Sequence, residues 1–251
     1  MKDETQQCQS CKQNFVIEAE DFNFYEKMHV PPPTWCPECR LERRLVNISE
    51  RALYKDQCDN CGKEIVSLFA PDTPHIVYCT PCWWSDSWEE RDFGKEYDFS
   101  RPFFEQLHEL RKVVPCQATN EKNSENCKYC NGVTRCKNCT YVFSGIQSIN
   151  CYYCLTPVFV KDSIDVDLSI NGDHAYWVLN SDDIYNVKFS YFSYDCLDCS
   201  FIINCVGCSD CFGCVNLRNQ KYCIWNKQYS KEDYKKEMIR WDLGSYKTIE
   251  S

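Results

Sequence analysis

Residues 196–214 read CLDCSFIINCVGCSDCFGC, and their cysteines recur in steps of three and nine. The same steps run from about residue 125 to residue 225. Taken every ninth residue, the series that begin at Cys127, Cys130 and Val133 contain mostly small or apolar residues, and the series from Asn126 is largely polar and turn-forming. A fixed short period of this kind predicts a parallel β-solenoid.

We expect two nine-residue units to form one turn of about 18 residues, with equivalent residues of neighbouring turns stacked about 4.8 Å apart. Small residues suit the narrow interior, where cysteine acts as a small, easily buried apolar residue. Cys196, Cys205, Cys214 and Cys223 are expected to face inward. Tyr176, Tyr185 and Tyr194 are expected to form an outward or flanking ladder in the same register.

The paired cysteines of this region leave three interpretations open: core thiols, ligands of three further zinc ions, or disulfide and redox chemistry. The core interpretation is favoured, because Val, Ser and Gly take the equivalent positions from 160 to 193 and a metal ligand is not exchanged so freely. The pairs are Cys127/Cys130, Cys136/Cys139, Cys151/Cys154, Cys196/Cys199, Cys205/Cys208 and Cys211/Cys214.

The N-terminal third carries cysteines in a different pattern, as two sets of paired C-x-x-C turns. Two such turns place four thiolates around one ion, which is the closed, structural kind of zinc site. We therefore predict two Zn²⁺ per chain, and His75 is interpreted as a surface residue. The predicted ligands are Cys8, Cys11, Cys36 and Cys39 in the first module and Cys58, Cys61, Cys79 and Cys82 in the second. The segments KEIVSLF and HIVYC are expected to form the hairpin arms of the second module.

Residues 5–44 also resemble a small bacterial family described as a probable zinc-ribbon domain. The resemblance implies zinc binding and no particular activity. A glycine usual after the first C-x-x-C turn is replaced by Lys12. The matching positions are Cys8, Cys11, Phe15, Phe24, Tyr25, Cys36, Pro37, Cys39 and Arg40. The whole chain is similar to bacterial proteins that join such a module to a cysteine-rich repeat.

Two helices are expected outside the zinc modules. One spans about 101–112, with Ser100 as its N-cap, and the other begins after Ser230 and caps the last turn of the solenoid. Aromatic residues between 83 and 99 either join the modules or stack on bases, and the interleaved acids favour the first. The fold class is thus mainly β with few helices. Its five parts are zinc-ribbon or treble-clef modules at 1–50 and 51–90, a connector helix at 91–124, the cysteine-rich solenoid at 125–225 and a cap helix at 226–251.

The charge of the chain argues against a general nucleic-acid-binding protein. The formal net charge is −9, and no part of the chain has the basic surface that nucleic-acid binding usually requires. A local nucleic-acid contact is left open for the cations after the first zinc site, which are Arg40, Arg43, Arg44, Arg51 and Lys55. The aspartates Asp162, Asp165, Asp167 and Asp173 are interpreted as a solvated face rather than as catalytic acids or a calcium site.

The chain has no apolar stretch long enough for a membrane span and no signal-peptide pattern, so we expect a cytoplasmic protein. It also lacks a phosphate-binding glycine loop, a nucleophile elbow and an HExxH motif. We therefore expect a non-enzymatic, zinc-binding scaffold with a protein partner. An enzyme whose site leaves no motif is the other alternative.

Overall fold

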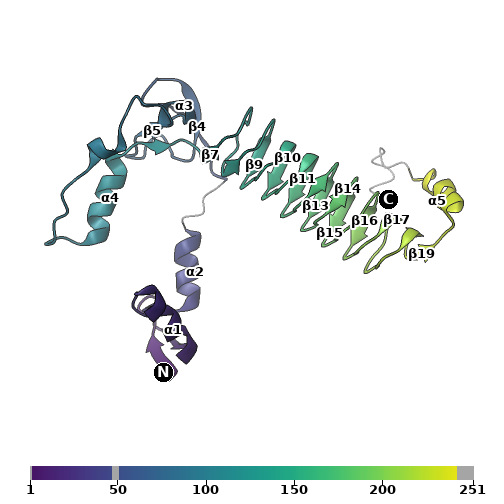
Figure 1. Cartoon of the computed structure of the whole chain (residues 1–251), viewed down its shortest axis with the longest axis horizontal. Coiled ribbons are helices and arrows are strands. Elements are labelled where there is room, and N and C mark those ends of the chain that lie inside the picture. The colour runs from purple at the N-terminus through teal and green to yellow at the C-terminus, as the bar shows by residue number, and fades with distance from the viewer. Residues whose placement is uncertain (1, 47–50, 242–251) are drawn as a thin grey trace. The chain divides into compact units, whose positions relative to one another are not determined.

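The structure is a computed structural model that describes residues 2–46 and 51–241. The chain forms two compact units, Met1–Ser49 and Glu50–Ser251. Figure 1 shows its helices and strands. None of the described helices is long and apolar enough to cross a membrane.

The first unit is a small zinc-binding-type module. Its antiparallel hairpin joins β1 (Glu4–Gln7) to β2 (Asn14–Ile17), and two helices follow, α1 (Ala19–Met28) and α2 (Pro37–Leu45). One C-x-x-C turn lies at the hairpin, and the other lies at the N-terminus of α2. Few apolar side chains support the fold, since the buried core consists of Cys8, Phe15, Ile17, Cys36 and Cys39. A module this small depends on its thiols.

The second module repeats the hairpin and the C-x-x-C turn at a helix N-terminus, but a short strand takes the place of α1. Its hairpin pairs β3 (Tyr54–Gln57) with β4 (Glu64–Ser67), so the predicted pairing of KEIVSLF with HIVYC is wrong. The strand from HIVYC, β5 (Val77–Tyr78), instead pairs in parallel with β6 (Cys116–Gln117) at the entrance to the solenoid. The helix α3 (Thr80–Trp83) carries the second C-x-x-C turn. The Trp83 indole N–H donates to the Pro115 carbonyl at 3.3 Å, which also ties the module to the solenoid.

The connector contains the predicted helix, α4 (Phe103–Val113), after a short 3-10 turn η1 (Glu90–Phe93). The predicted N-cap is wrong: Pro102 occupies that place, and the Ser100 hydroxyl donates to Asp98 instead. Among the aromatics before α4, the ring of Trp83 contacts that of Trp84 edge-on and that of Trp88 at a tilt. These contacts agree with a joining role rather than a stacking platform.

The second unit is dominated by the solenoid, whose successive turns appear as a row of short strands in Figure 1. Its strands are β7 (Glu121–Lys122), β8 (Val133–Thr134), β9 (Thr140–Phe143), β10 (Ile149–Leu155), β11 (Lys161–Asp167), β12 (Gly172–Asp173), β13 (Tyr176–Leu179), β14 (Ile184–Tyr185), β15 (Lys188–Tyr191), β16 (Ser200–Ile203), β17 (Ser209–Phe212), β18 (Lys221–Ile224) and β19 (Lys227–Gln228). Pairing is parallel from β7 to β18, and β18–β19 is an antiparallel end hairpin.

The predicted solenoid is confirmed, with about nine turns, but the predicted 18-residue turn is wrong. Ile149 pairs with Lys161, and Tyr176 pairs with Lys188, so each turn has 12 residues. The three inward series found at a spacing of nine are one series with a spacing of three. Nine and twelve are both multiples of three, so either spacing returns to an inward position. The tyrosine ladder expected at a spacing of nine is wrong for the same reason, because nine residues lead to a different side.

Every third residue from Asn123 to Trp225 has a positive φ, between 46° and 67°. Four such corners fall in each 12-residue turn, so the solenoid has four sides of three residues each. Asn and Asp tolerate this left-handed backbone, and they occupy many corners. At one edge, the amides of Asn126 and Asn138 donate to the corner residue of the next turn, at 2.9 and 3.0 Å.

Hydrogen bonds inside the solenoid explain why cysteine and serine can replace one another at inward positions. Cys205 donates its S–H to the carbonyls of Ile203 and Cys214, at 3.5 and 3.4 Å. The Ser148 hydroxyl makes the equivalent pair of bonds, to Ile146 and Pro157, both at 3.2 Å. Each side chain is small and satisfies its donor on the backbone beside it. The inward placement predicted for Cys196, Cys205, Cys214 and Cys223 is confirmed, because all four are buried.

The C-terminal cap is confirmed as α5 (Lys231–Met238), which follows the β18–β19 hairpin. Its N-cap is Ser230, whose hydroxyl accepts from the Asp233 N–H at 3.1 Å, as a capping box predicts. Tyr234 packs on Phe212 and Ile224 of the last turns. The helix therefore covers the apolar end of the solenoid. The predicted helix end at Gly244 lies outside the described residues.

Candidate metal centres and the solenoid surface

The first tetrad consists of the thiols of Cys8, Cys11, Cys36 and Cys39, whose sulfurs all lie within 4.8 Å of one another. Cys11 Sγ lies 3.7 Å from Cys36 Sγ. A tetrahedral zinc ion with bonds of about 2.3 Å requires sulfurs about 3.8 Å apart, so this spacing fits zinc. Cys8 and Cys36 also accept N–H bonds from the backbone of Cys36 and Cys39. Such bonds stabilise a bound thiolate.

The second tetrad has the same construction, from Cys58, Cys61, Cys79 and Cys82. Cys61 Sγ lies 3.9 Å from Cys79 Sγ, and the Cys79 N–H donates to Cys58 Sγ at 3.2 Å. The structure therefore brings together all eight predicted ligands, in the two predicted sets. The ring of His75 packs on Phe69 instead, with 4.9 Å between centroids, and His75 belongs to neither set.

The thiols of each tetrad differ in acidity. Burial would raise the pKa of Cys8, but the N–H groups of Cys36, Cys11 and Ser10 outweigh it and lower that pKa to about 6. Burial and the neighbouring sulfurs raise the pKa of Cys79 to about 12. One thiolate per set is thus favoured, and the others resist ionisation beside it. A divalent cation removes this conflict, because it stabilises all four negative charges.

The solenoid thiols lack this arrangement. Among the described residues, no three of them gather within 4.8 Å as the tetrad sulfurs do. Acidity does not separate the two groups of thiols. Hydrogen bonds from neighbouring thiols lower the pKa values of Cys127 and Cys211 to about 3, whereas burial raises those of Cys208 and Cys223 to about 11. The core interpretation is supported by the sulfur positions, because the described solenoid thiols form no set of converging ligands like the tetrads.

A third group of possible ligands lies on the solenoid surface, formed by Asp162, Asp173 and His174. His174 Nδ1 already lies 2.6 Å from Asp173 Oδ1, and the two side chains are 57% and 39% exposed. An open group of this kind is common without a metal, and we assign none to it. Sequence reasoning did not connect His174 with the aspartates, which meet only in the 12-residue register.

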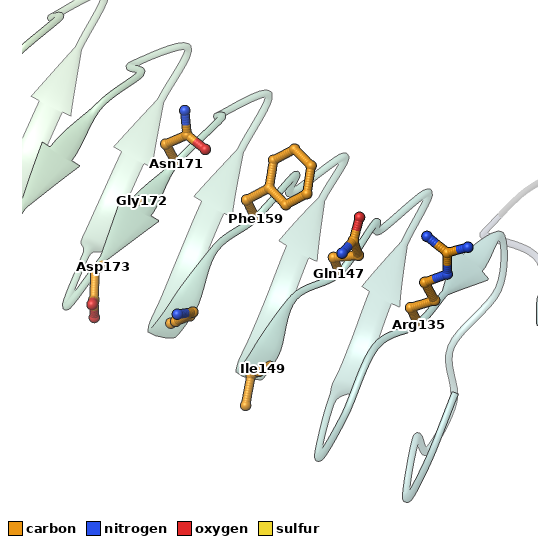
Figure 2. Close-up of a pocket in the computed structure, with 8 residues that line it drawn as sticks. Arg135, Gln147, Ile149, Phe159, Asn171, Gly172 and Asp173 are labelled. Atoms are coloured by element: carbon orange, nitrogen blue, oxygen red, sulfur yellow. The ribbon is translucent and has the colours of Figure 1, made fainter. Parts of the chain in front are cut away.

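An open trough of about 560 Å³ lies on one side of the solenoid (Figure 2). Its two edges carry side chains from successive turns, namely Arg135, Gln147, Phe159 and Asn171 on one edge and Ile149, Lys161 and Asp173 on the other. It holds no nucleophile paired with a base. The trough therefore gives no positive support to an enzymatic function.

The cations considered for nucleic acid do not form one site. Arg40, Arg43 and Arg44 lie on α2 in the first unit, and Arg43 lies 5.3 Å from the ring centroid of Trp35. Arg51 and Lys55 lie in the second unit, where they line an open hollow of about 420 Å³ with Tyr129.

A further surface feature was missed from the sequence. We name it the aromatic ladder, a series of corner residues spaced by twelve: Tyr129, Tyr141, Tyr153, Asp165, Trp177, Phe189 and Phe201. The rings of Tyr129, Tyr141 and Tyr153 stack in parallel, with centroids 5.0 and 5.3 Å apart. A second series, the apolar row, lies two residues further on in each turn: Phe143, Leu155, Asp167, Leu179, Tyr191 and Ile203.

Comparisons with known proteins support the zinc-binding type of the first module and give no family for the rest of the chain. A family model described as a probable treble clef domain matches residues 2–47. No curated protein matches the chain. A solved structure titled as a putative acetyltransferase from Bacillus cereus has a TM-score of 0.15 at 15% identity, over 49% of this chain and 92% of that chain. The family match places the first tetrad in a treble clef, a zinc-binding type of module.

Proposed function

We propose that the protein is a non-enzymatic scaffold that binds a protein partner along one side of its solenoid. The observation that carries this proposal is that most rings of the aromatic ladder are exposed on the same side as the partly exposed apolar row, although Phe189 of the ladder is buried. Trp177 is 53% exposed and Ile203 is 46% exposed. Extended apolar surfaces of this kind mark interaction sites on soluble proteins. Repeat proteins also present such regular faces to partners.

The zinc sites serve this function structurally. Both tetrads use four thiols and leave no position for water or substrate, so zinc would stabilise the modules and not act on a substrate. The second module is joined to the first turn of the solenoid through β5 and β6, and α5 covers the other end. Both ends of the solenoid are thus protected from pairing with other strands.

Site-specific photocrosslinking tests the proposal. A benzophenone amino acid is placed at Phe192, beside the apolar row, or at Tyr185, seven residues away on the opposite side. Both side chains are 48% exposed, so Tyr185 is a matched control. We expect crosslinks to one defined protein from position 192 and few from position 185. Equal crosslinking from the two positions, or none from position 192, would contradict the proposed binding side.

Local nucleic-acid contact is a weaker second proposal. The last turn of α2 exposes Arg43 and Arg44, but Arg51 and Lys55 belong to the other unit, and the whole chain carries −9. Phosphate contacts would be few and sensitive to salt. A third crosslinker position at Arg44 tests this idea in the same experiment, because it would yield crosslinked nucleic acid.

A further inference from the structure

One turn of the solenoid interrupts the binding side. In that turn, Asp165 replaces the ring of the aromatic ladder, and Asp167 replaces the apolar side chain of the neighbouring row. Val166 between them faces inward and is fully buried, so the turn keeps its register. Both carboxylates therefore lie on the outer surface, between turns that carry aromatic and aliphatic side chains.

The substitution opens a slot of about 270 Å³, lined by Tyr153, Asp165, Asp167, Trp177, Val178, Leu179 and Tyr191. Neighbouring turns are about 4.8 Å apart, so Tyr153 and Trp177 are separated by about 10 Å across the missing ring. Tyr153 is 56% exposed, whereas Tyr141, which has a ring on each side, is 39% exposed. The ring on each side of the gap therefore has free surface.

The carboxylates of the slot have no counterion among residues 2–46 and 51–241. The slot lining contains no lysine or arginine, and within the described residues neither carboxylate forms an ion pair. One oxygen of Asp167 accepts the Leu155 N–H at 2.7 Å, which fixes that carboxylate in place. Burial and the charge of Asp167 raise the pKa of Asp165. A cation in the slot would therefore be attracted by two carboxylates that no cation of the described residues neutralises.

We infer that this slot binds the guanidinium group of an arginine side chain from the partner protein. A cation at its centre would lie within about 6 Å of both ring systems, which is the range of cation–π attraction. A planar guanidinium also stacks on aromatic faces and donates several N–H bonds to carboxylates. This inference rests on the proposed function, because it assigns the chemistry by which the same side recognises its partner.

The test uses the full chain and short capped peptides. NMR follows the indole N–H of Trp177, assigned with Trp177→Phe, during titration with a Gly-Arg-Gly peptide. The Gly-citrulline-Gly peptide has nearly the same shape without the charge. We expect a saturable shift with the arginine peptide and none with the citrulline peptide. Equal shifts with both peptides, or shifts that avoid Trp177, would overturn the inference.

Variants locate the effect at the slot. Asp165→Asn keeps a residue that tolerates a positive φ, and we expect it to weaken arginine binding about tenfold, since one charge pair and its orientation are lost. Asp195→Asn, at an exposed corner elsewhere on the solenoid, should change binding by less than about twofold. Asp165→Tyr continues the ladder of Tyr129, Tyr141 and Tyr153 and should abolish binding while the protein remains folded.

Unchanged binding by the Asp165 variants would contradict the slot. The crosslinking experiment is independent of this result. If position 192 captures a protein but arginine peptides do not bind, the proposed function remains and the slot assignment is wrong. If arginine peptides bind and position 192 captures nothing, the slot remains and the extended binding side is wrong.

Discussion

Cys205→Phe is expected to unfold the solenoid or to lower its stability strongly, whereas Cys205→Val should leave it folded. Cys205 is fully buried in a narrow interior lined by small side chains. Overpacking a well-filled core costs about 1–3 kcal/mol and sometimes more, while a replacement of similar volume usually costs below about 1.5 kcal/mol. Denaturant unfolding followed by far-ultraviolet circular dichroism measures both variants.

The valine variant is the control that separates a core residue from a metal ligand. A core thiol loses only weak S–H bonds to the carbonyls of Ile203 and Cys214. A zinc ligand would leave three thiolates that hold the ion poorly. Release of metal or global unfolding by Cys205→Val would therefore show that the solenoid thiols are ligands.

Cys58→Ser is expected to remove the second zinc ion and to destabilise the solenoid, because that module joins the first turn through β5 and β6. Loss of a structural metal belongs to the class of changes that cost more than about 4 kcal/mol. The carbonyl of Ala118 would also lose the Leu68 N–H if the module came apart. Thermal unfolding of the full chain, followed by circular dichroism, gives the size of the effect.

Cys8→Ser is the matched control for this second prediction. It removes a ligand of the same type from the same kind of tetrad, but in the other compact unit. We expect it to release one zinc ion and to leave the solenoid transition unchanged. An equal loss of solenoid stability in the two variants, or none in either, would contradict the joining role of the second module.

The sequence alone predicted the parts of this protein that depend on short spacing. Two C-x-x-C turns define a tetrad almost without regard to the rest of the chain, and all eight thiols meet as expected. The inward series of the solenoid was also predicted, because burial in a narrow core restricts every third residue to small or apolar types. Ser230 and Asp233 predicted the start of α5 for a similarly local reason.

The length of the turn could not be obtained from the inward series, since both nine and twelve are multiples of three. The residues that distinguish a 12-residue turn from an 18-residue turn lie on the outer surface. Tyr129, Tyr141 and Tyr153 recur every twelve residues because stacked rings need the true register. The hairpin of the second module was misassigned for a different reason: β5 finds its partner in β6, a non-local pairing that no local pattern indicates.

The candidate binding side could not be predicted from the sequence for the same reason, because its residues meet only in the correct turn length. Asp165 and Asp167 looked like part of a solvated acidic stretch, and most of that stretch is exposed. Only the 12-residue register places Asp165 between Tyr153 and Trp177, where a ring is missing from the ladder. None of these residues indicates a binding site by itself, and the slot forms only because stacked turns bring them together.

The most direct test of this account is the number of metal ions per chain. Elemental analysis and native mass spectrometry of metal-replete protein should give two Zn²⁺, one per tetrad, because only those eight thiols converge among the described residues. Cys8→Ser and Cys58→Ser should each reduce the number to one. A count of three or more in the unmodified protein would contradict the account, because it would make the buried cysteines of the solenoid metal ligands and not the core of a scaffold.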